Sequence, residues 1–442
     1  MPPLLIDKIC KLVITPRTLS AREQTEIVLA FEDTLAVSHA GWHEPVVQAL
    51  LPLYRGDRVN LLNGEAALSM EHAAFLHAVA GHALDYDDVH LLSVTHPSVV
   101  IVPAILAVVE ERPALAGRAM YSYAVGVAVN IALGRVMGFS HYEKGWHATS
   151  TIGALAGAAA LSYLLGFDEA GTRRALSLSA SQAGGLQVNF GTMAKPVQAG
   201  QAASAAVRSA LMAEARVSAA DDVFAQSGFF DLYGGADKSA DPNKVPVDIE
   251  LTSLSRKLYP CCYATHRMIA AALGARGQLP KNRIPDDALI IVTVPYGLMR
   301  PLQIVDPRTG MEAKFCAAYI IALALIQGRV GLSDFEDAAV TRPEIRELMT
   351  QVELTEEPLQ GEVPIGIDHG QVHLTIRMGA QVLASSEIRH YPGSADQPVT
   401  DTEMNNKIGD CLARYQLNNK AGPTLEAFRD SVRQMIGLGF ER

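Results

Sequence analysis

The chain has 442 residues, of which 49% are hydrophobic and 19% are charged, and its formal net charge is -10 at pH 7. This composition excludes a disordered chain, and the length allows about two or three domains with sizeable buried cores. The acidic balance, without any run of Lys or Arg, excludes an extended phosphate-binding face, so we expect no nucleic-acid partner. An anionic ligand would need cations and helix N-termini gathered at one place to overcome the negative field of the whole chain.

The N-terminal sequence MPPLLIDKICKLVITPRTLS has neither a basic leader region nor a long apolar region. The longest apolar runs, such as VVIVPAILAVV from Val99, are shorter than the ~20 residues that a bilayer requires. The cysteines are odd in number and scattered, which favours a reducing compartment: Cys10, Cys261, Cys262, Cys316 and Cys411. We therefore expect a cytoplasmic protein without a membrane partner, and we interpret the adjacent Cys261 and Cys262 as small buried apolar residues.

From Ala21 to about Val223, apolar residues recur at helical spacing, which predicts a large all-helical domain. Its segments TIGALAGAAALSYLLG and VQAGQAASAAVRSALMAEA are rich in small residues and apolar on most sides, so they predict buried, closely packed central helices. The stretch 234–248 is rich in Gly, Asp, Pro and Lys and predicts a surface connection.

Beyond this connection, four segments have the alternation of strands: DALIIVTVPYG, EVPIGI, QVHLTIRM and QVLASSEIRHY. The segment KFCAAYIIALALIQG among them predicts a helix, so this part is expected to form a smaller α+β domain. The closing segment TLEAFRDSVRQMIGLG predicts a helix that returns to the first domain.

Titratable side chains are concentrated in GHALDYDDVHLLSVTHPS, residues 81–98, where Asp85 shares a helix face with His82 and Asp88. Four predicted helix openings each carry a titratable or cationic side chain: His96 before Pro97, His147 in GWHATSTIGALAG, Lys195 before Pro196, and His266 with Arg267 in YATHRMIAAAL. Helix N-termini carry unpaired N–H groups and partial positive charge. If these openings converge, they can bind a di- or tricarboxylate.

Each of these residues also has a purely structural interpretation. Asp85, Asp87 and Asp88 can be solvated charges at a helix C-terminus, and His82 and His90 can be structural or surface residues. Lys195, surrounded by Gly, Ala and Met, is either an exposed loop lysine or a buried cation that needs an anion. Tyr319 can be a core residue.

Two other functions fit parts of this pattern. HALDYDDVH contains imidazoles and carboxylates, but no zinc-type spacing is present, so we expect no metal site. DYDD also matches the DxDD acid of class II terpene cyclases, which need aromatic walls that a chain with 6% aromatic residues supplies poorly.

The motifs HALDYDDVH with THPS, GWHATSTIGALAGAAA, AKPVQAGQAA, KLYPCCYATHRMIAAAL and AKFCAAYIIALAL, in this order, resemble the MmgE/PrpD family over nearly the whole chain. That family includes 2-methylcitrate dehydratase, cis-aconitate decarboxylase and iminodisuccinate epimerase. The resemblance implies a discontinuous large helical domain, residues 1–255 and 410–442, a smaller α+β lid domain, residues 256–409, a homodimer, and catalysis without an organic cofactor. It implies an active-site cleft with Asp85, His96, His147, Lys195, His266 and Tyr319, near Lys257 and Arg267. Val89 stands where many relatives have Thr after the paired aspartates.

The reactions of the family share one requirement, the stabilisation of a carbanion or enediolate next to a carboxylate. Lys195 and helix N-termini are expected to supply this stabilisation. His96 or His266 is expected to move the proton, and His147 or Tyr319 to act as the acid, with Asp85 as the orienting group.

We therefore expect a lyase that resembles 2-methylcitrate dehydratase and acts on a small polycarboxylate. The alternatives are a dicarboxylate epimerase or isomerase, a decarboxylase, and a carboxylate-binding protein without activity.

Overall fold

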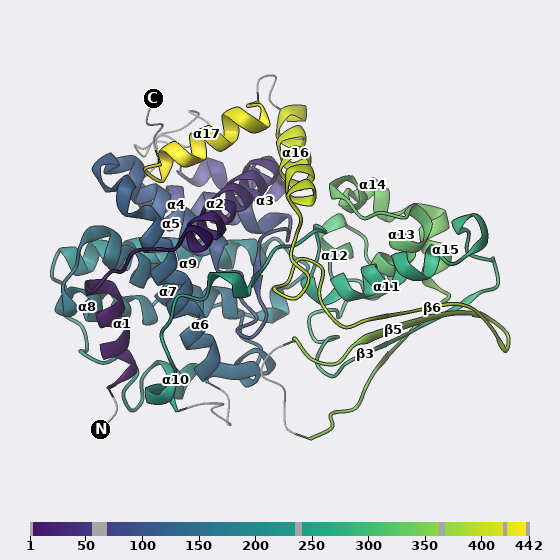
Figure 1. Cartoon of the computed structure of the whole chain (residues 1–442), viewed down its shortest axis with the longest axis horizontal. Helices are drawn as coiled ribbons and strands as arrows, with labels where there is room; N and C mark the ends of the chain where they lie inside the picture. The colour runs from purple at the N-terminus through teal and green to yellow at the C-terminus, as the bar shows by residue number, and fades with distance from the viewer. Residues whose placement is uncertain (1–2, 55–68, 235–240, 362–366, 419–421, 439–442) are drawn as a thin grey trace.

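The structure is a computed structural model and describes residues 3–54, 69–234, 241–361, 367–418 and 422–438. It is mainly α-helical, as predicted (Figure 1). The α-helices are α1 (Leu5–Ile14), α2 (Ala21–Gly41), α3 (Pro45–Leu50), α4 (Met70–Ala83), α5 (Ser98–Glu111), α6 (Ala119–Glu143), α7 (Ala148–Leu165), α8 (Glu169–Ala180), α9 (Ala194–Glu214), α10 (Phe229–Tyr233), α11 (His266–Arg276), α12 (Gly310–Ala313), α13 (Ala317–Gln327), α14 (Asp337–Val340), α15 (Pro343–Met349), α16 (Asp401–Asn418) and α17 (Leu425–Met435). The strands are β1 (Val89–His90), β2 (Leu254–Ser255), β3 (Leu289–Val294), β4 (Val352–Glu356), β5 (Val372–Met378) and β6 (Gln381–Ile388).

Helices α4, α5, α7 and α9 form the centre of the larger, helical part of the molecule, where α4 and α7 both pack against α9. The small residues predicted to allow close packing lie at these contacts. A Cβ added at Gly157 of α7 would lie only 2.7 Å from the Cβ of Ala206 in α9. A larger residue at either position would force the two helices apart.

Two helical stretches, Pro113–Glu143 and Ala148–Leu165, are long and apolar enough to cross a bilayer by length and composition alone. In each, 89% of the apolar window is buried inside the molecule. They serve as core helices of the helical part.

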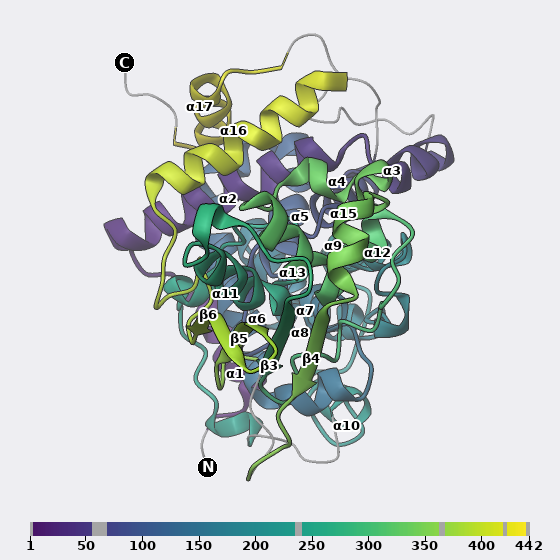
Figure 2. The ribbon, with the colours of Figure 1, turned by 90° about the vertical axis from the view of Figure 1, so that its right-hand side faces the viewer.

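The smaller part contains a four-stranded sheet in the order β4-β3-β5-β6, with β3 parallel to β4 and antiparallel to β5. Helices α11 and α13 pack on this sheet, and α15 packs on α13 (Figures 1 and 2). Three of its strands follow predicted segments. β4 was not predicted, and most of the predicted strand EVPIGI, residues 362–366, lies outside the described residues.

The closing helix α17 contacts α2 of the helical part, as the sequence indicated, and α16, which was not predicted as a helix, contacts α2 as well (Figure 1, yellow). The expected boundary between residues 409 and 410 falls inside α16. Farther back in the chain, β1 pairs antiparallel with β2, Val89 opposite Ser255. This pairing brings the acidic stretch after α4 next to Lys257, although the two segments are far apart in the sequence.

Candidate active site

The site is built around the turn that follows α4, where Asp85 has the left-handed φ of 51°. Three buried lysines donate hydrogen bonds to backbone carbonyls of this turn: Lys314 to Ala83 (3.2 Å), Lys257 to Asp85 (2.8 Å) and Lys407 to Tyr86 (2.8 Å). The lysines come from three separate segments of the second half of the chain. The conformation of the turn is therefore fixed by the packing of the second half of the chain against α4.

The Asp85 carboxylate is buried between two ammonium groups. Its Oδ1 lies 2.8 Å from Nζ of Lys195 and 2.7 Å from Nζ of Lys257. Burial raises the pKa of Asp85, but the two lysines outweigh burial and hold that pKa well below its ordinary value. Burial lowers the pKa of Lys257, whereas the charges of Asp85 and Asp87 more than reverse this and leave it raised. Asp85 is thus a permanent anion. The sequence left open whether Lys195 is an exposed loop lysine or a buried cation. The residue is only 5% exposed, so it is the buried cation.

A second carboxylate, Asp87, supports two imidazoles beside this ion pair. Its Oδ2 lies 2.7 Å from Nδ1 of His82 and 3.2 Å from Nδ1 of His96. The other nitrogen of His96, Nε2, lies 4.0 Å from Oδ1 of Asp85. Burial raises the pKa of Asp87, and the two histidines overcome burial and lower it well below its ordinary value. Both nitrogens of His96 therefore face carboxylates.

The interpretation of Asp87 and Asp88 as solvated charges is wrong, because both are buried. Asp88 accepts hydrogen bonds from the backbone N–H and the hydroxyl of Ser98. His90 is structural, since its Nδ1 lies 2.7 Å from the Ser93 hydroxyl. His82 belongs to the site itself, where its ring lies against those of His96 and His147.

His147 is the N-cap residue of α7, and its Nδ1 lies 2.7 Å from Oε1 of Gln198. Its other nitrogen, Nε2, is buried and has no hydrogen-bond partner among the described residues. Burial, together with the neighbouring His82 and Lys195, lowers the pKa of His147 well below its ordinary value. The ring is therefore neutral in the resting site.

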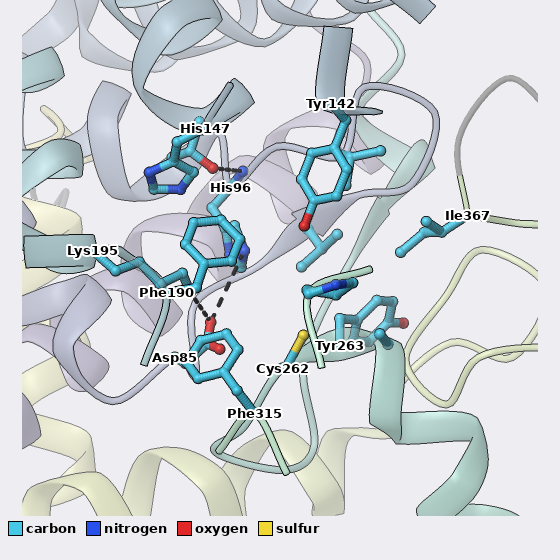
Figure 3. Close-up of a pocket in the computed structure, with 15 residues that line it drawn as sticks. Asp85, His96, Tyr142, His147, Phe190, Lys195, Cys262, Tyr263, Phe315 and Ile367 are labelled. Carbon is cyan, nitrogen blue, oxygen red and sulfur yellow. Dashed lines mark hydrogen bonds and ion pairs between the residues drawn. The ribbon is translucent and has the colours of Figure 1, made fainter. Parts of the chain in front are cut away.

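These groups surround a small cavity of about 40 Å³ (Figure 3). The cavity is lined by Asp85, Val89, Val94, His96, Tyr142, His147, Thr149, Phe190, Lys195, Cys262, Tyr263, Ala264, Pro301, Phe315 and Ile367. Tyr142 points its hydroxyl into this cavity (Figure 3). Charged groups on one side and apolar side chains on the other suit a small organic anion.

Of the residues expected in the cleft, Asp85, Val89, His96, His147 and Lys195 line this cavity, and Lys257 lies directly behind Asp85. The other three do not line it. His266 is fully buried and packs against the rings of Tyr259 and Tyr263. The Tyr319 hydroxyl donates to the carbonyl of Asp334 at 2.6 Å.

The third of these, Arg267, is fully buried and stabilises the surrounding backbone. Its guanidinium donates to the backbone carbonyls of Ile367, His369, Gly370 and Arg389. The Tyr391 hydroxyl lies 3.2 Å from the same group. Arg267 therefore fixes the chain around the sheet and does not face the cavity.

Sequence reasoning left His82 and Asp87 out of the predicted cleft, and it did not consider Tyr142 and Gln198. Gln198 carries a signal in AKPVQAG, because it lies three residues after Lys195 and so on the same helix face. Tyr142 follows Gly138, whose φ of 59° bends α6 near its end, and no sequence pattern shows where the helix turns.

Four residues, His82, Asp85, Asp87 and His96, offer atoms that lie within 4.8 Å of one another, close enough to hold a metal ion. The contacts within the group fit a metal poorly. Oδ1 of Asp85 already accepts from two ammonium groups, and Oδ2 of Asp87 already faces two imidazoles. A divalent cation would have to lie beside two ammonium charges. We interpret the group as an ion-pair network.

The mainly helical fold places this charged cavity beside the first turns of α5, α7 and α9. The models of the MmgE/PrpD N-terminal domain and C-terminal domain match residues 7–241 and 259–426. The chain belongs to the MmgE/PrpD family, as the motifs indicated.

Curated relatives are named cis-aconitate decarboxylase. The human protein is 27% identical over 354 residues, which cover 76% of this chain and 71% of the relative. The mouse protein is 28% identical over 390 residues, 83% of this chain and 74% of the relative. The Aspergillus terreus protein is 24% identical over 438 residues, 89% of this chain and 88% of the relative.

Proposed function

We propose that this protein is a lyase without an organic cofactor or metal, which acts on a small di- or tricarboxylate through a carbanion or enediolate next to a carboxylate. The observation that carries this proposal is Lys195, a buried ammonium that reaches the cavity while its ion-pair partner Asp85 is shared with Lys257. A fixed, buried cation is the group that stabilises an anion developing on the substrate.

Elimination of water is the reaction that we put first. It requires an acceptor for the proton on carbon and a donor for the departing hydroxide. His147 Nε2, unpaired at the cavity, is the proposed acceptor, and the Tyr142 hydroxyl is the proposed donor. Burial raises the pKa of Tyr142 well above its ordinary value, so the hydroxyl stays protonated and is available as a donor. Lys195 holds the negative charge between the two transfers.

Decarboxylation is the second candidate, and the names of the curated relatives favour it. In that reaction the bond to the carboxylate breaks, carbon dioxide leaves, and the same lysine stabilises the carbanion. No proton acceptor is needed, and one donor returns a proton to carbon.

We further propose that the sheet-bearing part closes over the cavity as a lid. Cys262, Tyr263, Pro301, Phe315 and Ile367 line the cavity from this part, opposite residues of the helical part. The volume of about 40 Å³ holds only a few water molecules, so a polycarboxylate enters only when the two parts separate. The homodimer implied by the family stays a proposal, which the mass of the protein in solution tests.

The proposal is tested by incubating the protein with a panel of C4 to C7 di- and tricarboxylates and following the products by NMR. Dehydration gives new alkene signals, decarboxylation releases carbon dioxide, and epimerisation converts one stereoisomer into another. Tyr142→Phe should slow dehydration or decarboxylation strongly and leave substrate binding nearly unchanged. Saturable binding of an acid without any product would show a carboxylate-binding protein instead.

A further inference from the structure

The side chain of Gln198 is held in one orientation. Its amide nitrogen Nε2 donates to the backbone carbonyl of Leu186 at 3.1 Å. A carbonyl oxygen can only accept, so the amide nitrogen must face Leu186, and Oε1 must face the other way. Oε1 lies 2.7 Å from Nδ1 of His147.

This orientation settles which nitrogen of His147 carries the hydrogen. An amide oxygen also only accepts, so Nδ1 of the neutral ring must be the N–H donor, and Nε2 must carry the lone pair. Nε2 is the buried atom without a partner among the described residues, and the His147 ring lines the cavity. A free histidine side chain prefers the opposite tautomer, so the protein imposes this one.

The same helix start supplies the cation and the orienting amide. Gln198 follows Lys195 by three residues in the first turns of α9, and both side chains are buried. The backbone carbonyl of Gln198 accepts from the Ser150 hydroxyl at 2.8 Å, which ties α9 to α7 beside His147.

We propose that Gln198 is a positioning residue that fixes His147 as the Nδ1–H tautomer, so that Nε2 accepts a proton from the substrate and cannot donate one in the neutral resting ring. The catalytic part of this inference rests on the proposed lyase function. It makes His147 the proton acceptor of the reaction, whereas the sequence analysis had suggested that His147 acts as the acid.

The tautomer is measured without any substrate. In protein labelled with ¹⁵N-histidine, long-range ¹H–¹⁵N correlation spectra distinguish a nitrogen that carries hydrogen from one with a lone pair, and His147→Gln identifies the signals. We expect Nδ1 to carry the hydrogen in the wild-type protein. Hydrogen on Nε2 would overturn the proposal, even if no variant at position 198 folds.

Gln198→Met keeps the size of the side chain and removes the acceptor. We expect the ring to shift to the Nε2–H tautomer and kcat to fall by about tenfold or more. Ser150→Ala is the matched control, because it also removes one buried hydrogen bond beside His147 but leaves the amide oxygen in place. It should keep the tautomer and change kcat less than about twofold. A wild-type tautomer and kcat in Gln198→Met would contradict the proposal.

Gln198→Glu restores an acceptor and adds a negative charge. It should keep hydrogen on Nδ1, recover activity relative to Gln198→Met, and move the rise of kcat with pH to higher pH, because the carboxylate raises the pKa of the ring. An unchanged pH profile would contradict the proposal. If the tautomer is as expected but no acid in the panel reacts, the proposed function fails and the tautomer assignment stands.

Discussion

Lys257 holds Asp85 by both its side chain and its backbone: Nζ lies 2.7 Å from Oδ1 and 2.8 Å from the carbonyl oxygen of the same residue. One fully buried ammonium therefore stabilises the left-handed backbone conformation of Asp85 and is also one of the two ammonium partners of its carboxylate. Lys195 pairs with the same oxygen, but only Lys195 also reaches the cavity. The two lysines are thus expected to have separable roles.

Lys195→Met should abolish most turnover while the protein stays folded. Loss of an ammonium opposite a developing anion costs about 3 kcal/mol of transition-state stabilisation, or about a hundredfold in kcat. Lys257→Met is the matched comparison. Lys257→Met leaves the Asp85 carboxylate with one ammonium partner and leaves the buried backbone carbonyl of Asp85 unpaired. We therefore expect it, in addition, to lower the free energy of unfolding by about 3 kcal/mol. Measurements of kcat and of Tm on both variants test this. Near-wild-type turnover in folded Lys195→Met would remove Lys195 from the mechanism.

Removal of divalent metal ions should leave the rate unchanged. The carboxylates of the His82, Asp85, Asp87 and His96 group already face ammonium and imidazole partners, which supply the positive charge that a metal would bring. The measurement is the rate after dialysis against a chelator, with and without added Mg²⁺, Mn²⁺ or Zn²⁺. A lost rate that one of these ions restores would show that the group is a metal site.

Val89 should restrict the substrate to acids that are shorter or carry fewer carboxylates than cis-aconitate and 2-methylcitrate. Its side chain lines the cavity and offers no hydrogen-bond donor. Val89→Thr should improve kcat/KM for tricarboxylates more than for the native substrate, by about 0.5 to 1.5 kcal/mol for one neutral hydrogen bond.

The comparison uses cis-aconitate, 2-methylcitrate and C4 dicarboxylates on both proteins. If the wild-type protein already dehydrates 2-methylcitrate as its best substrate, this account of Val89 is wrong and the dehydratase assignment still stands.

Asp88 should make the stability of the protein depend on pH. Burial raises its pKa to about 7, against an ordinary value of about 3.9 in an unfolded chain. The folded state therefore binds the proton more tightly, and this stabilisation is lost as the pH rises from about 4 to about 7. Asp88→Asn has no proton to lose at this position, so the Tm of the variant relative to that of the wild type should increase as the pH rises from about 4 to about 7. The exposed Asp287→Asn is the control, and a Tm difference that does not change with pH would contradict the prediction.

The sequence predicted the helix starts well, although His266 does not line the cavity. His147 caps α7, Lys195 lies in the first turn of α9, and His266 begins α11, as expected. These positions follow from local signals, namely Pro residues and the change to small apolar side chains. β4 escaped prediction because its sequence, VELTE, is polar, and it lies at the edge of the sheet.

The contacts across the chain could not be predicted in the same way. Tyr319 lies on a predicted helix, but its hydroxyl bonds to Asp334, which comes from a different turn. Asp87 was expected in solvent and is buried, because the histidines that compensate its charge come from α4 and from the loop before α5. Local spacing places a residue on a helix face, whereas its partners depend on which other segments cover that face.

The most direct test of the central claim is the transfer of deuterium from solvent to the substrate carbon next to a carboxylate. Metal-free protein is incubated in D₂O with C4 to C7 polycarboxylates, and incorporation is followed by NMR for the wild type and for Lys195→Met. We predict incorporation into substrate or product for at least one acid, about a hundredfold slower in the variant. Saturable binding of these acids without deuterium incorporation or turnover would contradict the claim that this site stabilises a carbanion.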